Sequence, residues 1–129
     1  MSSVKKNRVL LVDDSATALM MERMILDRGR YEVVTARNGV EAIEKAIALR
    51  PDAIVMDVMM PEMSGLEACR SIRAHATLRE TPVILVTTRG EPEHVEAGFS
   101  SGCNDYVTKP VDAVELLSKL QSVLGSEIR

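Results

Sequence analysis

The stretch Arg8–Asp13, which reads RVLLVD, decides the fold class of this chain. Its centre is an unbroken apolar run, and a second such run, VILV, occupies residues 83–86. Short apolar runs of this kind are typical of parallel strands whose two faces are both covered. The segments predicted to be strands are Arg8–Asp13, Tyr31–Ala36, Ala53–Asp57, Pro82–Thr87 and Asp105–Thr108.

Helical patterns separate these strands. The predicted helices are Ser15–Arg28, Val40–Leu49, Leu66–His75, Pro92–Ser101 and Ala113–Leu124. In the first helix, the spacing of Ala18, Met21 and Ile25 predicts that these three side chains face the core. Alternating strands and helices predict an α/β fold with a doubly wound parallel sheet. Right-handed crossovers then bring the loops that follow the strands to one edge of the sheet, where ligands bind.

Composition narrows the class of protein further. The 129 residues suit one domain, and a hydrophobic fraction of 46% is enough for a core. A net charge of -3 argues against direct nucleic-acid binding, and no apolar run is long enough to span a membrane. With only two cysteines, neither a disulfide framework nor a zinc site is expected. We expect a cytoplasmic protein with a domain over residues 8–125, flanked by tails at 1–7 and 126–129.

Charged and hydroxyl side chains follow the predicted strands. Asp13 and Asp14 come after the first strand, Asp57 ends the third, Thr87 ends the fourth and Lys109 follows the fifth. On parallel strands these groups would share one pocket, where carboxylates repel each other unless a cation joins them. Mg²⁺ is the expected cation because it prefers oxygen ligands and takes few protein carboxylates. A carboxylate in such a pocket is a candidate nucleophile toward phosphorus, with the hydroxyl and the ammonium neutralising phosphoryl oxygens.

Taken singly, these residues also have an ordinary structural interpretation, since aspartates are common in turns and at helix starts. Four motifs in order favour function: Leu11–Asp14 (LVDD), Asp57-x-x-x-Pro61-x-x-x-Gly65, Thr87, and Tyr106-x-x-Lys109-Pro110. On these motifs the chain resembles the receiver domain of two-component response regulators, including the chemotaxis type. The resemblance implies a flavodoxin-like sheet of strand order 2-1-3-4-5 with five helices.

The resemblance also implies a role for each residue of the pocket. Asp57 would be the phosphoacceptor, Thr87 the hydroxyl that moves to the phosphoryl group, and Lys109 the partner of a phosphoryl oxygen. The Lys109–Pro110 bond is expected to be cis, and Tyr106 would be the aromatic switch residue that follows Thr87. The implied Mg²⁺ ligands are Asp14, Asp57, the backbone carbonyl of Met59 and, through water, Asp13.

The implied protein is a phosphorylation-controlled switch and not a conventional enzyme. A histidine kinase or a phosphotransfer protein would donate the phosphoryl group to Asp57. A protein effector would bind the face formed by the fourth helix, fifth strand and fifth helix, with the chain as a monomer or a phosphorylation-dependent dimer. Two alternatives stay open: a receiver domain cut from a longer regulator, and a pseudo-receiver that binds partners without phosphorylation.

A few positions are expected to set properties particular to this chain. Met59 and Arg89 flank the expected hydrolysis path, so they are expected to tune the phosphoryl lifetime and favour slow to moderate self-dephosphorylation. Met20 is expected to lie opposite the core-facing stripe of the first helix, with Leu19 on its flank. Exposed apolar side chains there are candidates for docking a helical partner.

Overall fold

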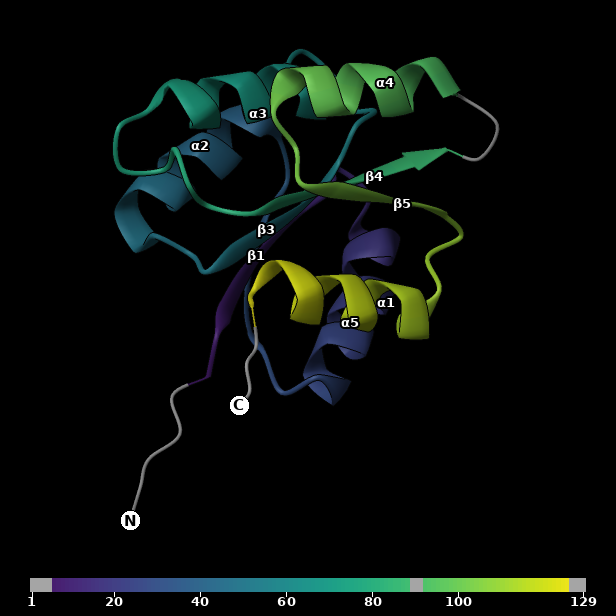
Figure 1. Ribbon diagram of the computed structural model, residues 1–129. Helices are drawn as coiled ribbons and strands as arrows, with labels where there is room; N and C mark the ends of the chain where they lie inside the picture. Colours follow the sequence, from purple (N-terminus) through teal and green to yellow (C-terminus); the bar gives the residue numbers. More distant parts are fainter. Residues whose placement is uncertain (1–5, 89–91, 126–129) are drawn as a thin grey trace.

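A computed structural model describes residues 6–88 and 92–125 (Figure 1). Its centre is a five-stranded sheet in the order β2-β1-β3-β4-β5, and every neighbouring pair is parallel. The strands are β1 (Arg8–Val12), β2 (Glu32–Ala36), β3 (Ala53–Asp57), β4 (Val83–Thr88) and β5 (Asp105–Lys109). The predicted doubly wound, flavodoxin-like architecture is therefore confirmed.

Helices cover both faces of the sheet (Figure 1). The helices are α1 (Ala16–Arg28), α2 (Gly39–Leu49), α3 (Gly65–Ala74), α4 (Pro92–Ser101) and α5 (Ala113–Val123). The pair α1 and α5 lies on one face, and α2, α3 and α4 lie on the other. Among the described residues, no helix is long and apolar enough to cross a membrane.

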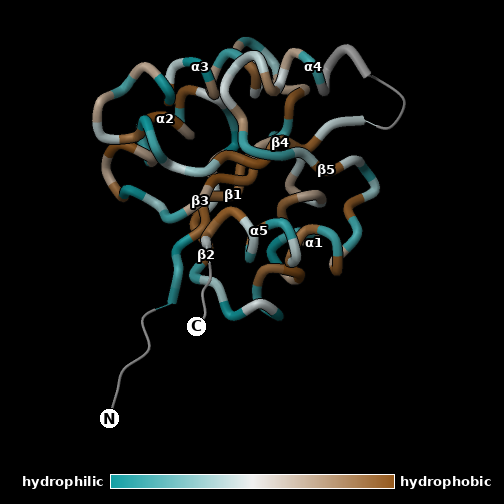
Figure 2. The backbone as a smooth tube through the Cα atoms, in the orientation of Figure 1, coloured by the Kyte–Doolittle hydropathy of each residue, from teal (hydrophilic) through white to brown (hydrophobic). Residues whose placement is uncertain are grey.

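The two faces of the sheet carry separate aliphatic cores. Alternate residues of each strand point to opposite sides, so Leu10 and Ile54 pack beneath α2 and α3, whereas Val9 and Leu11 pack beneath α1 and α5. The backbone coloured by hydropathy shows the central strands as mostly hydrophobic (Figure 2). Burial on both sides explains why these strands appear in the sequence as unbroken apolar runs.

Side-chain caps fix where the helices begin. Ser15 caps α1 by accepting a hydrogen bond from the backbone N–H of Ala18 at 3.1 Å. Asn38 and Asp112 cap α2 and α5 in the same way. Such caps satisfy backbone donors that the first helical turn leaves unpaired. The Ser15 cap also ends the loop that carries Asp13 and so helps to hold that loop against the sheet.

The predicted core face of α1 is wrong in part. Met21 is 60% exposed, while Leu19, Glu22 and Leu26 are only 8%, 4% and 0% exposed and face the core. Apolar residues surround most of this helix, so their spacing did not select one face. Leu19 therefore does not lie on an exposed flank, and its prediction as a docking residue is wrong.

The glycine after β3 allows the chain to turn back tightly against that strand. The Gly65 N–H donates a hydrogen bond to the carbonyl of Val58 at 2.9 Å, and a Cβ at Gly65 would collide with the Asp57 carbonyl. We expect Gly65→Ala to lower the free energy of unfolding by about 1–3 kcal/mol, because backbone must shift to admit the methyl group. Urea unfolding measures this loss. Ser71→Ala, an exposed change on the same helix, is the control, and equal stabilities of the two variants would contradict the prediction.

Candidate functional site

The carboxyl ends of the strands gather the predicted site residues at one edge of the sheet. Asp13 directly follows β1, Asp57 ends β3, and Lys109 ends β5. Carboxylate oxygens of Asp13, Asp14 and Asp57 all lie within 4.8 Å of one another. Asp13 and Asp57 are buried, whereas Asp14 is exposed. Parallel strands place these side chains together because all strands end on the same side.

Lys109 connects the two buried carboxylates. Its Nζ lies 3.2 Å from Asp57 Oδ2 and 3.4 Å from Asp13 Oδ2. The Lys109–Pro110 peptide bond is cis, as the resemblance implied. Burial alone lowers the pKa of Lys109, but the nearby carboxylates of Asp57 and Asp13 together outweigh burial, so the pKa is raised. The ammonium is therefore firmly held in its charged form.

Backbone donors orient the carboxylates. The N–H of Ser15 donates to Asp13 Oδ1 at 2.9 Å, and the N–H of Met59 donates to Asp57 Oδ1 at 3.3 Å. Burial raises the pKa of Asp57, and the charge of Asp13 adds to this effect, while Lys109 and the Met59 N–H oppose it. A further cation beside this site would relieve the repulsion that one lysine leaves in place.

Thr87 is a buried residue near the end of β4, at the same edge of the sheet as the aspartates. The residue is 2% exposed, and its Oγ1 has no hydrogen-bond partner among the residues that the structure describes. Leaving a buried hydroxyl unpaired costs on the order of 1–3 kcal/mol. This hydroxyl is thus available to a ligand group that arrives at the strand ends.

An aromatic contact connects β5 with α4. The rings of Tyr106 and Phe99 meet edge to face with centroids 6.0 Å apart. The Nζ of Lys119 lies 4.9 Å from the centroid of the Tyr106 ring and donates a hydrogen bond to the Tyr106 carbonyl at 2.6 Å. It also pairs with Asp105 at 3.3 Å. Tyr106 is therefore packed between α4 and α5, where a change of its side chain would affect both helices.

Of the remaining predicted positions, two are exposed, one is buried and one lies outside the described residues. Met20 is 60% exposed on α1, and Met59 is 57% exposed on the loop after β3. Arg89 lies outside the described residues. Leu19, as noted above, is a buried residue on the core side of α1.

Glu22 is a feature that the motif analysis missed. This glutamate on α1 is only 4% exposed. Its pKa is raised to about 7, mainly by burial and then by the charge of Asp13. The charge of Asp57 also raises this pKa, whereas the charge of Lys109 lowers it. Together with Lys109, Glu22 lines a pocket between α1 and the segment after β5. The one signal in the sequence was its spacing from Leu19 and Leu26, which places all three on one helix face.

The sequence pattern of the family described as response regulator receiver domain matches residues 9–121. The chain belongs to this family. It is thus a receiver domain of the two-component response-regulator class. Receiver domains are signalling regulators and not conventional enzymes. The wider family receives phosphoryl groups from histidine kinases and acts on effectors.

Similar proteins come from several signalling contexts. The transcriptional regulatory protein ResD of Bacillus subtilis is 36% identical over 96% of this chain and 50% of its own length. The Vibrio cholerae chemotaxis protein CheY4 is 37% identical with a TM-score of 0.86, covering 92% of this receiver and 99% of CheY4.

A third similar structure is the receiver domain of sensor histidine kinase PA1611 from Pseudomonas aeruginosa, described with a magnesium ion in its active-site cleft. It is 33% identical with a TM-score of 0.87, covering 95% of this receiver and 100% of that chain. This receiver spans about half the length of the curated relatives that it matches. The chemotaxis type is one of several contexts among these relatives, so the comparisons support the receiver family without selecting that type.

Proposed function

We propose that this receiver is a phosphorylation-activated switch, in which Asp57 accepts a phosphoryl group from a histidine kinase or a phosphotransfer protein. The observation that carries the proposal is the bridging of Asp57 and Asp13 by Lys109, together with the buried Thr87 hydroxyl of β4, which has no partner among the described residues. The site thus holds a nucleophilic carboxylate, a fixed ammonium and a free hydroxyl within one edge of the sheet. These are the groups that a transferring phosphoryl group needs around it.

The acidic cluster fits Mg²⁺. Three carboxylates within 4.8 Å offer hard oxygen ligands, and one lysine does not neutralise them. We assign Asp14, Asp57 and the Met59 backbone carbonyl as ligands, with Asp13 acting through water. Bound there, Mg²⁺ would neutralise phosphoryl oxygens. The magnesium named for the similar PA1611 receiver supports this assignment.

The chemistry assigned to the chain is one substitution at phosphorus. A carboxylate oxygen of Asp57 forms a bond to phosphorus, and the bond from phosphorus to the donor's histidine nitrogen breaks. Lys109 keeps its ammonium near the new phosphoryl oxygens, and the Thr87 hydroxyl, which has no partner among the described residues, gains one in the phosphoryl group. Met59 and Arg89 are assigned to tuning the later attack of water, which favours slow to moderate self-dephosphorylation.

The output follows from the packing of the switch residue. Movement of Thr87 toward the phosphoryl group changes the space open to Tyr106, which contacts Phe99 of α4 and Lys119 of α5. We assign the α4–β5–α5 face to a protein effector, with the receiver as a monomer or a phosphorylation-dependent dimer in the cytoplasm. An output domain elsewhere in a longer regulator is compatible with the same switch.

The test of this proposal is labelling by a small phosphodonor. Acetyl phosphate with Mg²⁺ is expected to add one phosphoryl group to the purified receiver, measured by intact mass. The same mixture with EDTA is expected to give no label above background, because the cluster then lacks its divalent cation. Absence of label with Mg²⁺ would favour the pseudo-receiver alternative over the switch.

The exposed methionines of α1 are assigned to docking of the phosphodonor protein. Met20 is 60% exposed, and a charge there would have to be desolvated on docking. We expect Met20→Glu to slow phosphotransfer from a donor protein about tenfold or more while acetyl phosphate labels it normally. Ile47→Glu, an exposed change on α2 across the sheet, is the matched control. Unchanged transfer to the Met20 variant would contradict docking at this helix.

A further inference from the structure

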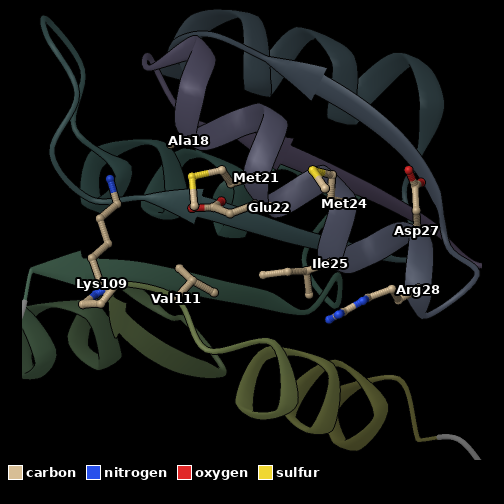
Figure 3. A pocket seen from close by; sticks show the side chains of 10 residues that line it. Ala18, Met21, Glu22, Met24, Ile25, Asp27, Arg28, Lys109 and Val111 are labelled. Carbon is tan, nitrogen blue, oxygen red and sulfur yellow. The ribbon is translucent and has the colours of Figure 1, made fainter.

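A pocket of about 690 Å³ opens between α1 and the chain that follows β5 (Figure 3). Its lining includes Met21, Glu22, Met24, Ile25, Lys109 and Val111. Most of this lining is apolar, yet it includes a carboxyl group beside the proposed phosphorylation site. The pocket therefore combines a hydrophobic wall with one deeply placed acid.

Within residues 6–88 and 92–125, no hydrogen-bond or ion-pair partner reaches the carboxyl group of Glu22. The residue is 4% exposed. The charges that act on it from the strand ends are those of Asp13 and Asp57, which repel it, and of Lys109, which attracts it. Burying an acid without a partner is unfavourable, so a donor or cation that enters the pocket gains from pairing with it.

The cations already at the pocket do not fill this role. Lys109 Nζ is 3.2 Å from Asp57 and 3.4 Å from Asp13, so its charge is shared by two other carboxylates. The side chain of Arg28 lies at the opposite end of the pocket from Lys109, with Asp27 at that end as well (Figure 3). Lys109, the lysine whose charge acts on Glu22, is thus already paired with two other carboxylates.

The walls of the pocket suit the aliphatic part of a long side chain. Met21, Ile25 and Val111 present thioether and branched aliphatic groups to the pocket, and methionine adapts its shape to what it contacts. Met24, which also lines the pocket, is 63% exposed, and Met20, which lies outside the pocket on the same helix, is 60% exposed. This apolar surface extends beyond the volume that a small molecule in the pocket would cover, which favours a protein occupant.

We propose that this pocket receives a lysine or arginine side chain from a helix of the phosphodonor protein, with its cationic head paired to Glu22 and its stem against Met21, Ile25 and Val111. This inference rests on the proposed function, because it names the chemistry by which the donor is recognised. An acidic side chain would meet Glu22, Asp13 and Asp57 as like charges. A purely apolar side chain would leave the Glu22 carboxyl buried without a partner.

The test compares two probes that differ only in charge. Blocked lysine, Nα-acetyl-lysine N-methylamide, mimics the proposed side chain, and the corresponding norleucine derivative replaces the ammonium by a methyl group. Binding is followed by NMR through the methyl signals of Met21, Ile25 and Val111. We expect the lysine probe to bind wild type about tenfold more tightly than the norleucine probe. Glu22→Gln is expected to remove this preference, whereas Glu44→Gln, an exposed change on α2, is expected to keep it.

Equal binding of the two probes to wild type, or a lysine preference that survives in Glu22→Gln, would overturn the proposal. If Glu22→Gln does not fold, the wild-type preference is measured across pH instead. It is expected to fall as pH decreases below about 7, because Glu22 then takes up a proton while the probe stays charged. The other charged groups facing the pocket are Asp13, Asp57, Lys109, Asp27 and Arg28. A preference that does not change with pH would overturn the proposal in that case.

The probes are used without a phosphodonor, so the result does not depend on phosphorylation. Failure of acetyl phosphate labelling would count against the switch and leave the probe preference intact. Failure of the probe preference would count against the basic side chain and leave the switch intact. The two hypotheses are thus separated by independent measurements on the same purified chain.

Discussion

Asp57→Asn is expected to reduce phosphoryl labelling by acetyl phosphate and Mg²⁺ to background. The amide has nearly the shape of the carboxylate, but it lacks the anionic oxygen that forms the bond to phosphorus. It also weakens the ion pair in which Lys109 Nζ lies 3.2 Å from Asp57 Oδ2. Of the predictions made for this receiver, this one has the largest expected effect on activity.

The matched control for this variant is Asp52→Asn. Asp52 is an exposed aspartate at the opposite edge of the sheet, where it accepts a hydrogen bond from the Arg8 backbone N–H at 2.7 Å. Intact mass before and after treatment is expected to show the added phosphoryl group in wild type and in the control. Circular dichroism confirms that both variants are folded. Label that persists in Asp57→Asn would show that another residue accepts the phosphoryl group.

Glu22→Leu is expected to raise the free energy of unfolding by about 3 kcal/mol above pH 7. Burial, followed by the charge of Asp13, raises the pKa of Glu22 from 4.5 to about 7 in the folded protein. The folded state thus favours the protonated acid, while the unfolded chain ionises near pH 4.5. The free-energy cost of ionising the buried Glu22 carboxyl is absent below pH 4.5, grows between pH 4.5 and about 7, and is complete above pH 7.

Chemical unfolding at several pH values measures this dependence. Wild type is expected to lose stability from pH 5 to pH 7 more steeply than Glu22→Leu, because leucine at this position has no proton to release. Glu44→Leu is the control, since Glu44 is exposed on α2. Parallel stability profiles for wild type and Glu22→Leu would show that the buried carboxyl does not carry the penalty.

The strands and their ends were predictable from sequence because their physical signal is local. Val9 to Val12 and Val83 to Val86 are short apolar runs that are typical of strands in a sheet covered on both faces. Once parallel pairing follows from the alternation of strands and helices, the meeting of Asp13, Asp57 and Lys109 follows from topology. The sequence therefore predicts this cluster, and the structure confirms that the three side chains meet.

The orientation of α1 was not predictable in the same way. Leu19, Met20, Met21 and Leu26 are all apolar, so the helix lacks a sharp polar face from which its core side could be deduced. Packing against α5 and the sheet placed Leu19 inside and Met21 outside. Glu22 lies among the core-facing positions, where a charged residue is normally disfavoured, so neither composition nor motif indicated its burial. Tertiary contacts decided both outcomes.

The scarcity of aromatic residues gives this receiver a simple optical signature. The chain has no tryptophan and two tyrosines, so its near-ultraviolet absorbance and circular dichroism arise almost wholly from Tyr31 and Tyr106. Tyr31 packs against the core between the sheet and the helices α1 and α5, whereas Tyr106 lies against Phe99 and Lys119. Tyr31→Phe would leave a single strong chromophore at the α4–β5–α5 face. The conformation of that face then becomes readable in unlabelled protein, without an attached fluorophore.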